Sequence, residues 1–73
     1  MMKRKIKLHG LDFILIGDND GAIATPEQYA NFDISYAHLY RDGTIMRFSK
    51  QIGTIDDIEF LEVIDDNKGE VIL

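Results

Sequence analysis

Apolar and polar residues alternate near the start of the chain in the way that a one-sided β-strand requires. In residues 5–8, lysines alternate with Ile6 and Leu8, which puts the apolar side chains on one face. A second apolar segment, 11–16, follows Gly10. This glycine fits either a two-residue hairpin turn or a bulge within one long strand. The hairpin pairs Leu8 with Leu11, Lys7 with Asp12 and Ile6 with Phe13.

A loop and a short helix follow these apolar segments. Residues 17–21 read Gly-Asp-Asn-Asp-Gly and form the strongest break in the pattern. Thr25 suits a helix N-cap, and Gln28 completes a capping box three residues later. We predict a short helix near residues 25–32. Its inner face carries Tyr29 and Phe32.

Strand-like residues on both sides of Asp42-Gly43 predict a second hairpin. Asp-Gly is typical of a two-residue hairpin turn, because both positions tolerate positive φ. The register of such a turn places Tyr40 opposite Ile45 and His38 opposite Arg47. One face then carries Ala37, Leu39, Met46 and Phe48, and the other carries Tyr36, His38, Tyr40 and Arg47.

The end of the chain fits two structures. Residues 52–54 form a break, and a capping-box pattern at Thr54 and Asp57 permits a helix over 58–64. The β-branched and aromatic content favours a strand instead, which forms a final hairpin with residues 71–73. We predict the hairpin and keep the helix as the alternative.

These elements together predict a single domain over residues 1–73. Its class is α+β and mostly β, with one antiparallel sheet of about five or six strands and one short helix. The predicted core consists of Ile6, Leu8, Leu11, Phe13, Leu15, Ala37, Leu39, Met46, Phe48, Ile58 and Val63.

Composition narrows the class of protein. The chain has 73 residues and no cysteine, which excludes disulfides, thiolate metal sites and thiol nucleophiles. A chain of this size buries only about 60–65% of its unfolded surface, so we expect a homo-oligomer.

The longest apolar run, 13–16, is far too short for a membrane span. The basic N-terminus also lacks the pattern of a signal peptide, and we expect a cytoplasmic protein.

Charge is unevenly distributed along the chain. Thirteen acidic and eight basic residues give a net charge of −5, which argues against direct nucleic-acid binding. Residues 1–10 hold four basic side chains and no acidic one, whereas residues 54–73 hold seven acidic side chains and one lysine. We interpret this as two ends that neutralise each other within one sheet. The alternatives are a basic arm for an acidic partner, and an acidic region that mimics nucleic acid.

The acidic loop carries the one family resemblance in the chain. With Gly21 at the sixth position, Asp18 and Asp20 fall at positions three and five and Glu27 at position twelve. This spacing resembles the calcium loop of EF-hand proteins. The first ligand position holds Ile16, where the family uses Asp. The other interpretation of these residues is a polar turn between two strands.

The mixed face of the central hairpin is the candidate binding site. Tyr36, His38, Tyr40 and Arg47 can stack a planar ring and pair with a phosphate or carboxylate, as in a nucleotide-like ligand. The sequence contains no catalytic nucleophile in a known context and no cofactor motif. We therefore predict a protein that is not an enzyme, with no metal and no cofactor.

A small acidic binding module is the leading interpretation. We predict a protein–protein interaction module or inhibitor, of the size and charge seen in accessory proteins of phages and mobile elements. The alternatives are a binder of a nucleotide-like ligand and a degenerate calcium-loop protein. For the leading interpretation, the candidate contacts are Asp56, Asp57, Glu59 and Glu62.

Overall fold

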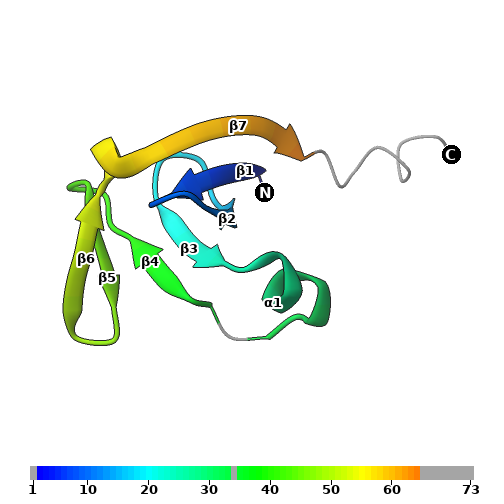
Figure 1. The fold of residues 1–73 in the computed structure, drawn as a ribbon, viewed down its shortest axis with the longest axis horizontal. Coiled ribbons are helices and arrows are strands. Elements are labelled where there is room, and N and C mark those ends of the chain that lie inside the picture. Colours follow the sequence, from blue (N-terminus) through cyan, green and yellow to red (C-terminus); the bar gives the residue numbers. More distant parts are fainter. Residues whose placement is uncertain (1, 34, 65–73) are drawn as a thin grey trace, which may run out of the picture.

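The computed structural model describes residues 2–33 and 35–64. Their strands form one antiparallel sheet with the order β6-β5-β4-β3-β2-β1-β7, curled into a half-barrel (Figure 1). The prediction of a mostly β, antiparallel sheet with one short helix is confirmed, but five or six strands is too few. The elements are β1 (Lys3–Leu8), β2 (Leu11–Ile16), β3 (Gly21–Ala24), α1 (Pro26–Asn31), β4 (Ala37–Leu39), β5 (Thr44–Arg47), β6 (Lys50–Thr54), η1 (Ile55–Asp57) and β7 (Ile58–Ile64).

The hairpin of β1 and β2 has the register that the sequence predicts. Leu8 opposes Leu11 and Ile6 opposes Phe13. The two turn residues have positive φ, 52° at His9 and 80° at Gly10, as expected for the turn type that matches strand twist. The alternative of one long bulged strand is therefore wrong.

The hairpin of β4 and β5 differs from the prediction by one residue. The Tyr40 N–H donates to the Thr44 carbonyl over 2.8 Å, and the Gly43 N–H donates to the Tyr40 carbonyl over 2.9 Å. The loop therefore has three residues, with Gly43 at a φ of 96°, a common alternative to the two-residue turn. As a result, His38 opposes Met46, and Leu39 opposes Ile45.

β6 is a strand that the sequence analysis missed. It pairs with β5 across the two-residue turn at Phe48-Ser49, although its Gly53 indicated a break. The next turn is η1, whose capping box at Thr54 and Asp57 is present but caps one turn of 3-10 helix only. β7 confirms the predicted strand and excludes the helix. Its predicted hairpin partner, 71–73, lies outside the described residues.

Helix α1 begins as its sequence predicts. The Gln28 N–H donates to Thr25 Oγ1 and the Thr25 N–H donates to Gln28 Oε1, each over 3.0 Å. The helix ends after one and a half turns at Phe32, which is the C-cap with a φ of 55°. Phe32 therefore lies past the helix rather than on its inner face, and that part of the prediction is wrong.

The core lies on the concave face of the sheet. Of the predicted core residues, Leu11, Phe48 and Val63 are exposed and Met46 is half-buried. The changed β4–β5 register explains Phe48 and Met46, because it turns Ile45 inward in their place. Leu11 is 61% exposed because it lies at the end of its hairpin. The buried core cluster is Ile6, Leu8, Phe13, Leu15, Ile23, Ala37, Leu39, Ile45 and Ile58.

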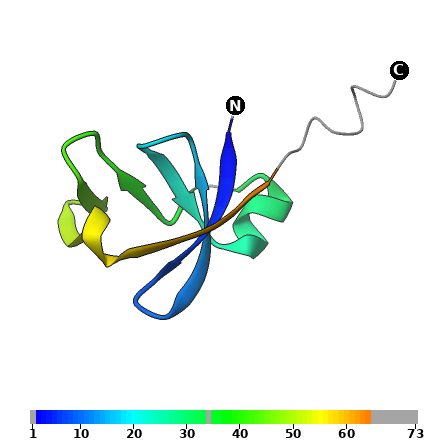
Figure 2. The ribbon, with the colours of Figure 1, turned by 90° about the horizontal axis from the view of Figure 1, so that it is seen from above.

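β1 and β7 bring the oppositely charged parts of the chain together. β7 runs alongside β1 (Figures 1 and 2), and Lys7 opposes Glu59 across the pair. The Lys5 Nζ lies 3.9 Å from Glu62 Oε2. The predicted location of the two oppositely charged segments side by side in one sheet is therefore confirmed for the described part of β7, where one ion pair joins them.

Candidate functional site

The sheet has a second face, opposite the core, which we call the helix-side face. Residues directly opposite each other on neighbouring strands share a face. The pairings Lys3–Ile16, Ile16–Ala22, Ala22–His38 and His38–Met46 therefore define one continuous row across this face. α1 packs over β2 and β3 and covers only part of the row, so the rest is open to solvent or ligand.

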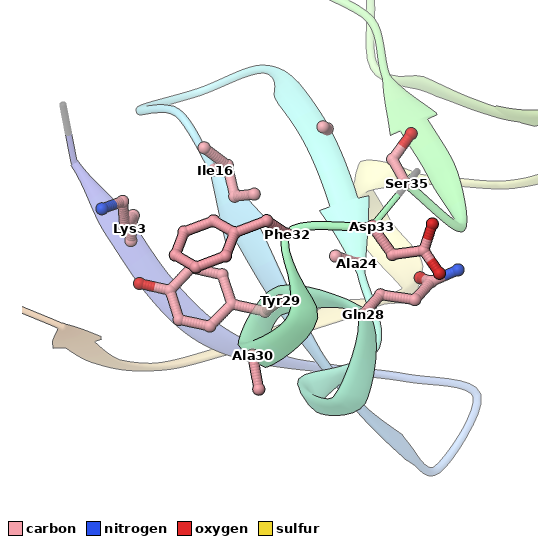
Figure 3. Close-up of a pocket in the computed structure, with 10 residues that line it drawn as sticks. Lys3, Ile16, Ala24, Gln28, Tyr29, Ala30, Phe32, Asp33 and Ser35 are labelled. Carbon is pink, nitrogen blue, oxygen red and sulfur yellow. The ribbon is translucent and has the colours of Figure 1, made fainter.

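A hollow of about 690 Å³ lies between α1 and this face. Its size falls within the range of small-ligand pockets, about 300–1,000 Å³. Alanines on β3 keep its floor low, and the side chains of Tyr29 and Phe32 extend over it toward β1 and β2 (Figure 3). The residues that line it are Lys3, Ile16, Ala22, Ala24, Gln28, Tyr29, Ala30, Phe32, Asp33 and Ser35.

Phe32 is the most unusual residue of the hollow. Its side chain is 96% exposed, and its backbone is left-handed with a φ of 55°. A bulky residue is rare in this conformation, and glycine is the usual residue at such a helix end. Phe32 therefore lies outside the core in a backbone conformation that favours glycine. Phe48 in the β5–β6 turn shares both features, with a φ of 58° and 89% exposure, but Phe32 alone of the two lines the hollow.

The rim of the hollow adds polar groups to an apolar interior. The Lys3 Nζ lies 5.8 Å from the centroid of the Tyr29 ring, within reach of a cation–π contact. Gln28, Asp33 and Ser35 stand on the other side (Figure 3). The arrangement can accept an apolar or aromatic group and position it with hydrogen bonds.

Two of the predicted site residues, Tyr36 and Arg47, lie against the core. The Tyr36 ring packs 4.8 Å from the Phe13 ring, centroid to centroid. The Arg47 guanidinium lies 4.1 Å from the centroid of the Tyr36 ring and 5.1 Å from that of Phe48. Its Nε also donates to the Tyr36 carbonyl over 3.2 Å. These contacts give Arg47 a structural role in holding the β5–β6 hairpin.

The other two predicted site residues, His38 and Tyr40, lie on the helix-side face. Their rings form an exposed pair with centroids 4.6 Å apart, and His38 lies beside Ala22 at the floor of the hollow. The predicted pairing of His38 with Arg47 is wrong, because the three-residue loop shifts the register. The four residues are thus two separate pairs, and their part in binding stays a prediction.

The acidic loop at 17–20 connects two strands, whereas the EF-hand loop connects two helices. Gly17 and Gly21 allow the two ends of the loop to approach. A Cβ on Gly21 would lie 2.2 Å from the Ile16 carbonyl oxygen. Asp20 Oδ2 lies 3.9 Å from Arg41 Nε. Among the described residues, no three His, Cys, Asp or Glu side chains gather as a metal site requires.

The carboxylate of Asp42 has a lowered pKa, which follows from hydrogen bonds inside the β4–β5 loop. The Thr44 N–H donates to Asp42 Oδ1 over 2.9 Å, and the Thr44 hydroxyl lies 2.7 Å from the same oxygen. These hydrogen bonds stabilise the carboxylate, so they lower the pKa of Asp42 below its ordinary value. Because these hydrogen bonds lie within the β4–β5 loop, the lowered pKa indicates that Asp42 stabilises this loop.

The hollow was not found by the sequence analysis. A phenylalanine at the end of a short helix was the only local signal, and the sequence interpretation placed it on the inner face of that helix beside Tyr29. No protein-family model, curated protein or solved structure matches the chain. Within residues 2–33 and 35–64, no helix has the length and hydropathy needed to span a bilayer. The function is therefore inferred from the site alone.

Proposed function

We propose that this protein is a small, non-enzymatic protein-interaction module, and that it binds a partner through the hollow between α1 and the helix-side face. Such a module can act as an adaptor or as an inhibitor, and a chain without cysteine suits the cytoplasm. The observation that carries the proposal is Phe32, a 96% exposed aromatic residue at the mouth of an apolar hollow.

Backbone strain supports the proposal. A left-handed non-glycine residue costs on the order of 1 kcal/mol or more, a substantial cost for a small protein. Residues in such conformations cluster at binding and switch sites. Exposed aromatic residues are also the side chains that most often anchor protein interfaces.

The positions of the arginines favour a protein partner over a nucleotide-like ligand. A nucleotide site needs a cation placed for the phosphate. Arg47 was the predicted cation, but it stacks on Tyr36 on the core side, away from His38 and Tyr40. Around the hollow, the helix-side face combines aromatic and apolar surface with a few polar groups, and Lys3 is the one cation among the lining residues.

Site-specific photocrosslinking tests the proposal. The photoreactive analogue p-benzoylphenylalanine is placed at Phe32 in one variant and at Leu11 in another. Leu11 is an exposed apolar residue at the opposite end of β2. We expect a discrete covalent adduct with one protein of the cell extract from position 32 only.

The Phe32→Gly variant provides the competition control. Added in excess, unlabelled wild-type protein should suppress the adduct, whereas the Phe32→Gly protein should suppress it far less. Equal adducts at both positions, or none at position 32, would refute the hollow as the interaction site.

A further inference from the structure

β7 forms one edge of the sheet, and its outer side is unpaired in the described structure. It is the longest strand, with seven residues, and it is the last in the sheet order, beyond β1. It contains no proline or lysine, and of the features that commonly protect edge strands it carries two glutamates and a β-bulge. Alternate backbone N–H and C=O groups of such an edge are free to pair with another strand.

A β-bulge in the pairing with β1 changes which face of the sheet the side chains of β7 lie on. The sequence of β7 alone does not predict this distribution. The pairing with β1 is irregular between Arg4 and Ile6. Phe60 opposes Ile6 and Val63 opposes Arg4, so both lie on the core side of the sheet. Glu59 and Glu62 lie three apart in the sequence, yet the bulge puts both on the helix-side face.

The two faces of the edge differ sharply as a result. Phe60 is 38% exposed and Val63 is 49% exposed, so both leave apolar surface on the core side. The Arg4 guanidinium shares this side and lies 5.0 Å from the centroid of the Phe60 ring. On the other face Glu62 lies near Lys5, with 3.9 Å between Oε2 and Nζ. Lys7 instead lies 3.2 Å from Asp12, and Glu59 has no ion pair among the described residues.

We propose that β7 binds an extended basic segment of a partner protein by β-augmentation. The segment adds an eighth strand, with apolar side chains over Phe60 and Val63 and lysines or arginines beside Glu59 and Glu62. Main-chain hydrogen bonds then supply affinity, and the alternate side chains supply specificity.

The negative charge of the β7 edge favours a basic partner segment over a second copy of this chain. A second β7 would bring Glu59 and Glu62 against their own counterparts, with Asp56 and Asp57 nearby. Like charges on opposed strands are unfavourable, and each chain carries a net charge of −5. Residues 65–73 hold three acidic side chains and one lysine, so this segment brings no net positive charge either.

The test uses the full chain, labelled with nitrogen-15, and a capped eight-residue peptide that alternates lysine and valine. We expect the peptide to shift the amide resonances of residues 58–64. It should also slow hydrogen exchange at alternate amides of this strand at least about tenfold. Added salt should weaken the binding, because the attraction is partly electrostatic.

Two control peptides separate β-augmentation from simple charge attraction. A peptide with glutamate in place of lysine should not bind. A lysine–valine peptide with methylated backbone amides keeps the charge but cannot form the ladder, and it should not bind either. Equal binding of the methylated peptide, or shifts centred on another part of the chain, would overturn the proposal.

Protein variants locate the charge effect. Glu59→Gln/Glu62→Gln should weaken peptide binding at least about fivefold, as expected for two exposed charges. Asp18→Asn/Glu27→Gln removes two exposed charges elsewhere and should leave it unchanged. Phe32→Gly should also leave it unchanged, which keeps this proposal separate from the one on the hollow. Outer β7 amides that are already protected in the free protein would show a different occupant and contradict the proposal.

Discussion

At the scale of single residues, Phe32 has opposite expected effects on stability and on binding. Its backbone conformation lowers the stability of the fold, whereas its exposed ring is the proposed contact with a partner. Its φ of 55° favours glycine, and its exposed ring contributes little packing to the fold. We expect Phe32→Gly to raise the free energy of unfolding by about 1 kcal/mol relative to Phe32→Ala. Urea unfolding of the two variants measures this difference. A Phe32→Gly protein less stable than Phe32→Ala would show that the residue is not strained.

Asp42 makes a second prediction at this scale, on pH. Its pKa is lowered in the folded protein by the hydrogen bonds from Thr44. The stabilisation is therefore fully present above the ordinary pKa of an aspartate, about 3.9. It is lost as the pH falls through the lowered pKa of the folded state.

The melting temperatures of the wild type and of Asp42→Asn between pH 6 and pH 2 test this expectation. The asparagine keeps the acceptor oxygen but does not titrate. The advantage of the wild type should shrink as the pH falls below 4. A constant difference across the range would exclude a role for the Asp42 carboxylate.

At the scale of elements, the β2–β3 loop depends on glycines for close backbone approach. Gly21 has a φ of 144°, and a Cβ there would lie 2.2 Å from the Ile16 carbonyl oxygen. Gly10 also has positive φ, but a Cβ there would meet nothing within 4 Å. We expect Gly21→Ala to cost at least about 2 kcal/mol more than Gly10→Ala, in thermal or urea unfolding. Equal costs would contradict the loop geometry.

The sequence predicts elements well where local chemistry is specific. The capping box of Thr25 and Gln28 predicted the helix start. Gly10 predicted the first hairpin with its correct register as one of two alternatives, and the positive φ of His9 and Gly10 in the structure selects it. The second register failed because Asp-Gly fits a two-residue and a three-residue loop equally well. Only tertiary packing, with Ile45 in the core, selects between them.

The candidate sites could not be predicted in the same way. The hollow brings β1, β2, β3 and α1 together, and no local pattern encodes that arrangement. The acidic and apolar faces of β7 depend on a bulge that is visible only in its pairing with β1. The four predicted site residues of the central hairpin lie on two different faces because the β4–β5 register differs by one residue from the prediction. Such a shift moves side chains to the other face of the sheet.

At the scale of the whole molecule, β7 contributes to the core through Ile58. Ile58 is 9% exposed and belongs to the core cluster, whereas Val63 on the same strand is 49% exposed. Both were predicted as core residues. We expect Ile58→Ala to cost about 2–4 kcal/mol and Val63→Ala less than about 1 kcal/mol. Urea unfolding would contradict the fold if the two costs were equal.

The pairing of β1 with β7 also governs the order in which the protein can form during synthesis. Arg4 and Leu61, which are joined by a hydrogen bond, stand 57 positions apart in the chain. The hairpins can form as soon as they leave the ribosome, but β1 must wait for nearly all of the described chain to be made. Closing so long a loop is entropically costly, and proteins rich in such contacts fold slowly. Until β7 arrives, the nascent chain carries an open β1 edge and an uncovered part of its core, the surfaces that chaperones bind and that promote aggregation.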